Sequence, residues 1–161
     1  MTVRQIHDFL DADTHTALRA KFDHVEWVRD DRPGLRHAAI SAKWDGFAPF
    51  LIEAAKRLPL FRALPFEIQV TRMIGGESFA DHRDALYLRD DDNAPLTTFV
   101  YYAGDRATFA GGRLFTAGEI IEPADNSLVL FDGLVDHSIE LLEGDDARRL
   151  TINGCYKAVA V

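Results

Sequence analysis

Two residues of the kind that bind metal ions stand two positions apart near the middle of the chain, His82 and Asp84. Residues at i and i+2 of a β-strand point to the same side, so an imidazole and a carboxylate from one short segment can approach one ion. His137 is the best candidate for a third ligand, because it follows an apolar run that ends in a turn at 131–133. Two imidazoles and one carboxylate leave coordination positions open, which suits non-haem iron(II) that handles O2 and a chelating cosubstrate.

His-x-Asp alone is a weak signal, because such tripeptides occur by chance. The chain has one cysteine, Cys155, so no cysteine pair is present for a structural zinc site or an internal disulfide. A reducing cytoplasm is therefore the expected compartment, and it would also keep iron ferrous. The four other histidines lie in the N-terminal region and are interpreted as surface or packing residues: His7, His15, His24 and His37.

An anionic cosubstrate requires a fixed cation, and the segment 148–157 begins with Arg148 and Arg149. Alternation along a strand places these two arginines on opposite faces. Arg148 shares its face with apolar residues that are expected to pack against helices, so Arg149 is predicted to point into the interior. A guanidinium buried there needs an anion, and its planar fork binds a carboxylate through two hydrogen bonds. The polar face of this segment comprises Arg149, Thr151, Asn153 and Cys155.

A tyrosine can assist the same arginine. Alternation over residues 98–102 puts Thr98, Val100 and Tyr102 on one face. If that face is interior, Tyr102 offers a hydroxyl group to the carboxylate of the cosubstrate. The alternative interpretation is that Tyr101 and Tyr102 both serve only packing.

The elements that must position these residues fall into two regions. Residues 1–60 are predicted to form a helical support, with helical spacing of apolar residues over 4–21 and over 46–58, the latter ended by Pro59. From Phe66 onward, short β-rich runs alternate with turn residues. This order predicts a mainly β fold of the sandwich or jelly-roll type, with the helices packed on one sheet. The expected β-rich runs are 66–74, 96–104, 112–116, 127–133, 137–143 and 148–157.

Length and charge narrow the class further. The 161 residues correspond to one ordinary domain, which we take as 1–161. The net charge of -8 disfavours nucleic acid and anionic lipid surfaces as partners. No apolar run of about 18 residues is present, so no membrane span is expected, and the first residues do not resemble a signal peptide. The sequence indicates no oligomeric state.

Five motifs follow one another in the second region. They are IQVTRMIGGESFADHRD (68–84), LTTFVYYAGD (96–105), FAGGRLFT (109–116), IIEPADNSLVLFDGLVDHSIELL (120–142) and RRLTINGCYK (148–157). Together they resemble the prolyl 4-hydroxylase-like branch of the 2-oxoglutarate/iron(II) dioxygenases. The matching features are a strand with a Gly-rich turn and His-x-Asp, a Gly-Gly-x-Leu turn, a distal histidine and a terminal arginine strand. Their order and extent make this resemblance far more specific than His-x-Asp alone.

The resemblance implies a double-stranded β-helix. It implies iron(II) ligands at His82, Asp84 and His137, and 2-oxoglutarate bound by iron and by Arg149 with help from Tyr102. It also implies an enzyme that uses O2 to hydroxylate an unactivated C–H bond, with release of succinate and CO2. Asp84 favours hydroxylation because related halogenases lack this carboxylate, although desaturation or ring closure uses the same centre.

Two departures from the family pattern concern the site. Met73 stands where members often carry a tyrosine that helps to hold the cosubstrate, and Arg72 beside it can alter how an anion is seated. The sequence does not identify the substrate: a free amino acid, a small metabolite and a peptidyl residue are all candidates. The segment 85–95, ALYLRDDDNAP, is interpreted either as a solvated loop or as a lid whose aspartates meet a basic substrate.

Two other classes of function are alternatives to the dioxygenase hypothesis. A non-catalytic jelly-roll module that binds or senses a metal or ligand would be favoured by loss of an iron ligand or of the arginine, and all four residues are present. An enzyme of the cupin type with another metal usually has a His-x-His pattern, which this sequence lacks.

Overall fold

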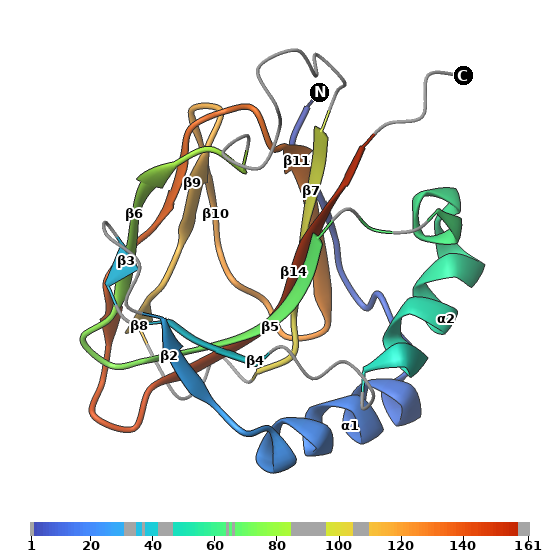
Figure 1. Cartoon of the computed structure of the whole chain (residues 1–161), viewed down its shortest axis with the longest axis horizontal. Helices are drawn as coiled ribbons and strands as arrows, with labels where there is room; N and C mark the ends of the chain where they lie inside the picture. Colours follow the sequence, from blue (N-terminus) through green and yellow to red (C-terminus); the bar gives the residue numbers. More distant parts are fainter. Residues whose placement is uncertain are drawn as a thin grey trace.

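Strands dominate the structure, a computed structural model that describes residues 2–30, 35–36, 38–41, 47–63, 65, 67–84, 96–104 and 110–157. They form a seven-stranded sheet, a five-stranded sheet and one separate pair, and the strand pairings between them are antiparallel. Figure 1 shows the two larger sheets as two walls, with the helices outside one of them. The mainly β character predicted from the sequence is confirmed.

The larger sheet has the strand order β1-β11-β7-β14-β5-β4-β2. Strand β14 lies between β7 and β5 and pairs with both of them along most of its length. The bounds are β1 (Arg4–Ile6), β2 (Val28–Asp30), β4 (Ala38–Ser41), β5 (Glu67–Ile74), β7 (Leu96–Tyr102), β11 (Ser127–Asp132) and β14 (Arg148–Lys157).

The smaller sheet has the order β10-β9-β12-β6-β3. Its strands are β3 (Leu35–Arg36), β6 (Ser78–His82), β9 (Leu114–Thr116), β10 (Glu119–Ile121) and β12 (His137–Ile139). The separate pair consists of β8 (Ala110–Gly111) and β13 (Leu142–Glu143). Because β6 and β12 are neighbours, His82 and His137 become cross-strand partners.

In the described part of the chain, two α-helices, each followed by a 3-10 turn, cover the outer face of the larger sheet (Figure 1). Helix α1 (Ala12–Lys21) begins where the Asp11 side chain accepts a hydrogen bond from the backbone N–H of Thr14 at 2.9 Å, which satisfies a donor that the first turn leaves free. Helix α2 (Ala48–Arg57) lies along the expected range 46–58. The turns are η1 (Phe22–His24) and η2 (Pro59–Arg62). No helix among the described residues is long and apolar enough to cross a membrane.

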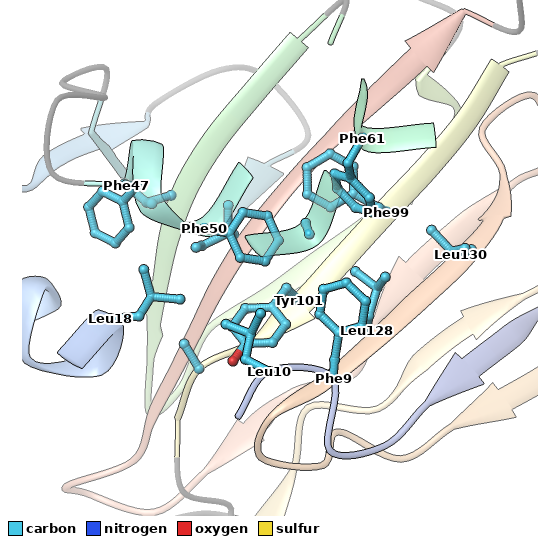
Figure 2. Close-up of a cluster of buried hydrophobic side chains, with 14 of the residues drawn as sticks. Phe9, Leu10, Leu18, Phe47, Phe50, Phe61, Phe99, Tyr101, Leu128 and Leu130 are labelled. Atoms are coloured by element: carbon cyan, nitrogen blue, oxygen red, sulfur yellow. The ribbon is translucent and has the colours of Figure 1, made fainter. Parts of the chain in front are cut away.

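A core of aromatic rings joins these helices to the larger sheet, as Figure 2 shows. The ring of Phe50 on α2 lies 5.0 Å from that of Tyr101 and 6.2 Å from that of Phe99, both on β7. Phe61 lies 5.1 Å from Phe99. Because alternate residues of β7 face the helices, the intervening residues face the opposite sheet.

The N-terminal region departs from the prediction of helices alone. Residues 4–6 form β1, which pairs with β11, and only the later part of the predicted helical segment is helix α1. Asp8 has a left-handed backbone (φ 48°), and the cap at Asp11 fixes where the helix begins. Strands β2, β3 and β4 also lie within the region predicted to be a helical support. The apolar spacing was thus ambiguous, because a strand and a turn can present the same residues to the core.

Candidate metal and cosubstrate site

Three side chains converge between the sheets. His82 is the last residue of β6, His137 is the first residue of β12, and Asp84 follows β6. One potential ligand atom from each lies within 4.8 Å of those of the other two. The Oδ1 atom of Asp84 is 3.5 Å from Nε2 of His137 and 3.9 Å from Nε2 of His82. In the described part of the chain, no other group of histidine, cysteine or acidic residues forms such a cluster.

Asp84 does not reach this position as a residue of the same strand as His82, which was the expectation from the sequence. It lies beyond the end of β6, so the strand does not carry both ligands. Its backbone N–H donates to the carbonyl of Gly133 at 3.0 Å, which ties it to the segment before His137. Its Oδ2 atom accepts a hydrogen bond from the hydroxyl of Thr98 on β7. Asp84 therefore keeps Oδ1 for the imidazoles while Oδ2 is held by the larger sheet.

Both imidazoles are oriented by main-chain carbonyl groups. Nδ1 of His82 lies 2.8 Å from the oxygen of Ala80, and Nδ1 of His137 lies 2.9 Å from the oxygen of Val135. A carbonyl only accepts, so Nδ1 carries the proton and Nε2 of the neutral ring offers its lone pair. This orientation by a second hydrogen bond is common in metal-binding histidines.

The three residues shift one another's pKa values. Burial by itself raises the pKa of Asp84, but hydrogen bonding and charge from His137, together with the hydroxyl of Thr98, hold it below the usual value. Burial lowers the pKa of His82. For His137 the effect of burial is outweighed by Asp84, which raises the pKa. One carboxylate and two imidazoles form a donor set that fits a divalent transition metal.

An exposed ion pair links the two segments that carry the ligands. Nε and Nη2 of Arg83 donate to the two carboxylate oxygens of Asp136 at 2.6 and 2.8 Å. Arg83 lies between His82 and Asp84, and Asp136 precedes His137. This bidentate contact fixes the spacing of the segments from the outside.

Arg149 lies on the inner face of β14 and is only 2% exposed. Its Nη2 donates to the hydroxyl of Tyr102 at 3.2 Å, and its guanidinium carbon stands 4.9 Å from the centre of the Tyr102 ring. Its Nη1 lies 3.7 Å from the sulfur of Met73. Among the described residues, Nε has no hydrogen-bond partner and no carboxylate forms an ion pair with this arginine. A buried cation with only neutral neighbours fits the carboxylate of an anionic cosubstrate.

These groups belong to one cavity. His82, Asp84, His137 and Arg149 all line it, and Tyr102 contacts Arg149. The structure thus brings together the five residues singled out in the sequence. The remaining wall is uncharged and is lined by Gln69, Thr71, Phe79, Thr98, Val100, Leu114, Phe131, Ile139, Thr151, Asn153, Gly154 and Cys155.

Other residues raised by the sequence have different places. Arg72 does not line the cavity: its guanidinium lies 4.7 Å from the centre of the Trp27 ring, on the other face of β5. Tyr101 and the buried His15 belong to the core, with 2.6 Å between the tyrosine oxygen and Nδ1. His7 and His24 are exposed. His37 and the segment 85–95 lie outside the described residues.

Sequence reasoning missed the roles of three residues of the site. Gly133 supplies the carbonyl that holds Asp84, and Thr98 supplies the hydroxyl. Gln69 lines the cavity from β5. The period-two alternation that identified Arg149 would also have identified Gln69, whereas nothing local in the sequence marks Gly133 as a partner of Asp84.

Comparisons with known proteins agree with this geometry. A model of the 2OG-Fe(II) oxygenase superfamily matches residues 68–157. No curated protein matches the chain. Among solved structures, a prolyl-4-hydroxylase of Pseudomonas putida is similar with a TM-score of 0.72 and 22% identity, covering 98% of this chain and 92% of that one.

Two further structures show how varied such relatives are. One is a prolyl hydroxylase of Trichoplax adhaerens in complex with a peptide fragment of the hypoxia inducible factor oxygen degradation domain. It has a TM-score of 0.70 and 15% identity, and the match covers 96% of this chain and 83% of that one. The non-heme alpha-ketoglutarate-dependent epimerase SnoN of nogalamycin biosynthesis has a TM-score of 0.71 and 15% identity, and the match covers 95% of this chain and 76% of that one. At such identities these likenesses concern the fold. The family match covers more than half of the sequence and includes every site residue named above, and the chain therefore belongs to the 2OG-Fe(II) oxygenase superfamily.

Proposed function

We propose that this member of the superfamily is an Fe(II)- and 2-oxoglutarate-dependent hydroxylase, with iron held by His82, Asp84 and His137. Arg149, assisted by Tyr102, binds the carboxylate of 2-oxoglutarate that lies away from the metal. One observation carries the proposal: three convergent ligand atoms and a buried arginine without a described acidic partner share one cavity. We further propose that 1–161 is one domain whose two larger sheets are the walls of a double-stranded β-helix.

Each protein group has a definite task in this proposal. The imidazole Nε2 atoms and Oδ1 of Asp84 hold the metal on one side and leave its other positions open. Arg149 fixes the length of the dicarboxylic acid that the cavity accepts, because its buried guanidinium stays in place. The apolar side chains of the cavity wall, among them Phe79 and Ile139, exclude water from the reacting groups.

Bound iron would supply the activation of O2 coupled to decarboxylation of 2-oxoglutarate to succinate and CO2. The retained carboxylate of Asp84 favours hydroxylation over halogenation, because it takes a coordination position that a halide would need. The substrate is a small metabolite, an amino acid or a peptidyl residue.

The test is an anaerobic titration of metal-free protein with Fe(II) and then with 2-oxoglutarate, followed by visible absorption. A weak charge-transfer band from the chelated keto acid is expected in the wild type and is expected to be absent from His137→Ala. The exposed histidine variant His24→Ala is the control and should keep the band. Iron binding without a band would indicate another metal enzyme or a non-catalytic module instead.

A further inference from the structure

Two carboxamide side chains stand side by side on the cavity wall, and the proposed function gives neither of them a role. Gln69 on β5 and Asn153 on β14 both line the cavity and are cross-strand partners in the antiparallel register. Directly opposite residues on neighbouring strands have Cβ atoms about 4.5–5.5 Å apart. The two amide groups can therefore contact one ligand group together.

The amide of Asn153 is held in place from one side. Its Oδ1 atom accepts a hydrogen bond from the hydroxyl of Thr71 and another, at 3.3 Å, from the hydroxyl of Thr151. Two donors occupy both lone pairs of this oxygen. Its Nδ2 atom has no partner among the described residues and is not sealed from the cavity. Asn153 therefore presents an oriented hydrogen-bond donor.

Gln69 supplies the complementary group. It is half-buried, and neither atom of its amide is hydrogen-bonded within the part of the chain that the structure describes. Free rotation about its last torsion lets it present a donor or an acceptor beside Asn153. Polar groups left unpaired in a cavity are favourable only when a ligand or water pairs with them.

The charge of the filled site selects among ligands. The two positive charges of iron(II) and the one on Arg149 would be matched by Asp84 and by the two carboxylates of 2-oxoglutarate. The rest of the described wall carries no charge. A substrate group with a net charge would be buried there without a counter-ion, which is energetically unfavourable. The buried part of the substrate is therefore neutral.

Resting on the proposed function, we propose that Gln69 and Asn153 bind the substrate through an uncharged amide group beside the C–H bond that is hydroxylated. An amide offers one acceptor for Nδ2 of Asn153 and one donor for the Gln69 side chain. A free amino acid would bring an ammonium and a carboxylate group, for which the described wall has no partners. Amides of this kind occur in polypeptides and in small carboxamides.

The experiment measures succinate formed from 2-oxoglutarate by the iron-loaded enzyme. The probes are N-acetyl amino acid N-methylamides, capped tripeptides that contain the same residues, and the free amino acids. Blocked compounds should stimulate succinate formation and free amino acids should not. Stimulation by capped tripeptides alone would indicate a polypeptide as the source of the amide, and stimulation by single blocked residues would indicate a small molecule.

Variants identify the residues. Gln69→Leu and Asn153→Leu, which keep the size of the side chain, should each raise the KM of the stimulating compound about tenfold, the loss expected for one hydrogen bond. Gln69→Glu keeps the shape and adds a negative charge, so it should shift preference toward amino acid N-methylamides with a free ammonium group. A merely structural role would not produce that shift. Glu119→Gln, exposed at the far edge of the smaller sheet, is the control.

Three results would overturn the amide site: no response from any blocked compound, equal stimulation by the free amino acids, or a wild-type KM in both leucine variants. Failure of the proposed function is a separate result. If the charge-transfer band is missing from the wild type, that function falls; if the band is present and blocked compounds have no advantage, only the amide site falls.

Discussion

At the scale of single residues, Arg149 is the group whose surroundings are hardest to explain without a ligand. It is buried, its nearest partners are a phenol and a thioether, and its Nε is unpaired among the described residues. Retaining a cation there costs stability. The same arrangement makes it a fixed and buried hydrogen-bond donor to a carboxylate, and such charge-assisted hydrogen bonds are strong.

Replacing Arg149 by methionine keeps an unbranched side chain in the core and removes the charge. Two charge-assisted hydrogen bonds contribute about 3 kcal/mol together, so the KM for 2-oxoglutarate should rise at least about 100-fold. Steady-state kinetics with varied 2-oxoglutarate measures this. Arg148→Met, one residue away and exposed, is the matched control. An unchanged KM in Arg149→Met would remove this residue from the cosubstrate site.

The site residues could be recognised in the sequence by their types and order, whereas the residues that hold them in place could not. Imidazole and carboxylate groups are typical metal ligands, and a guanidinium group is a typical anion ligand. Alternation along a strand indicated that Arg149 faces inward. Asp84 is different, because a contact with Gly133 holds it where no strand does. Such a contact joins residues about fifty positions apart, and no local pattern encodes it.

At the scale of elements, the turn between β11 and β12 matters because it contacts both Asp84, a proposed metal ligand, and strand β7. Gly133 donates its N–H to the carbonyl of Leu96 at 2.9 Å and accepts from Asp84. A Cβ atom added at Gly133 would lie 2.5 Å from the hydroxyl oxygen of Thr98 and 2.9 Å from Leu96. Glycine is therefore required here by close approach rather than by an unusual backbone angle.

Gly133→Ala should push Thr98 away from Asp84 and so release Oδ2 of the carboxylate. We expect Fe(II) affinity to fall about tenfold and the free energy of unfolding to fall by about 1–3 kcal/mol, as overpacking usually costs. Isothermal titration and chemical denaturation measure the two effects. In a Thr98→Ala background the same substitution should cost less, which a double-mutant cycle would detect. Additive costs would mean that the two residues do not interact.

The elements were predicted unequally well. The runs at 66–74, 96–104 and 127–133 correspond to β5, β7 and β11, and the run at 148–157 corresponds to β14. These strands are buried on at least one face, so their composition is strongly constrained. The short strands β1 to β4 escaped prediction because each depends on a partner strand, and β1 has its partner more than a hundred residues away.

At the scale of the whole molecule, the helices and the larger sheet share one core, and Tyr156 lies inside it. Tyr156 is 1% exposed, with its ring 5.5 Å from that of Phe61 and 5.8 Å from that of Phe99. Its hydroxyl has no hydrogen-bond partner among the described residues. Burial raises the pKa of Tyr156 from 10.0 to about 12.

Tyr156→Phe should stabilise the protein by about 1 kcal/mol at neutral pH, because it removes a buried unpaired hydroxyl group. Because burial raises the folded-state pKa, the unfolded chain ionises at this tyrosine before the folded protein does. The wild-type protein therefore keeps its full stability below pH 10 and loses part of it as pH rises toward about 12. The variant should lack this part of the alkaline loss of stability. Urea denaturation at several pH values measures both effects.

Tyr101→Phe is the matched control for this experiment. The hydroxyl of Tyr101 lies 2.6 Å from Nδ1 of His15 and donates to Oδ1 of Asn126 at 3.0 Å. Its removal should destabilise the protein, since it takes away both hydrogen bonds and leaves Nδ1 of the buried His15 without this partner. Equal effects of the two substitutions would contradict the distinction between a paired and an unpaired hydroxyl.

The central place of β14 has a consequence for how the protein is made. In the described sheet, β5 and β7 meet only through β14, which follows both of them in the sequence. A nascent chain contains both segments that bear the proposed iron ligands before it contains β14, so the two halves of the wall behind them are then still unjoined. The strand that closes this wall also brings Arg149. Translation therefore completes the sheet and the proposed cosubstrate site together, and a chain that stalls before residue 148 can form neither.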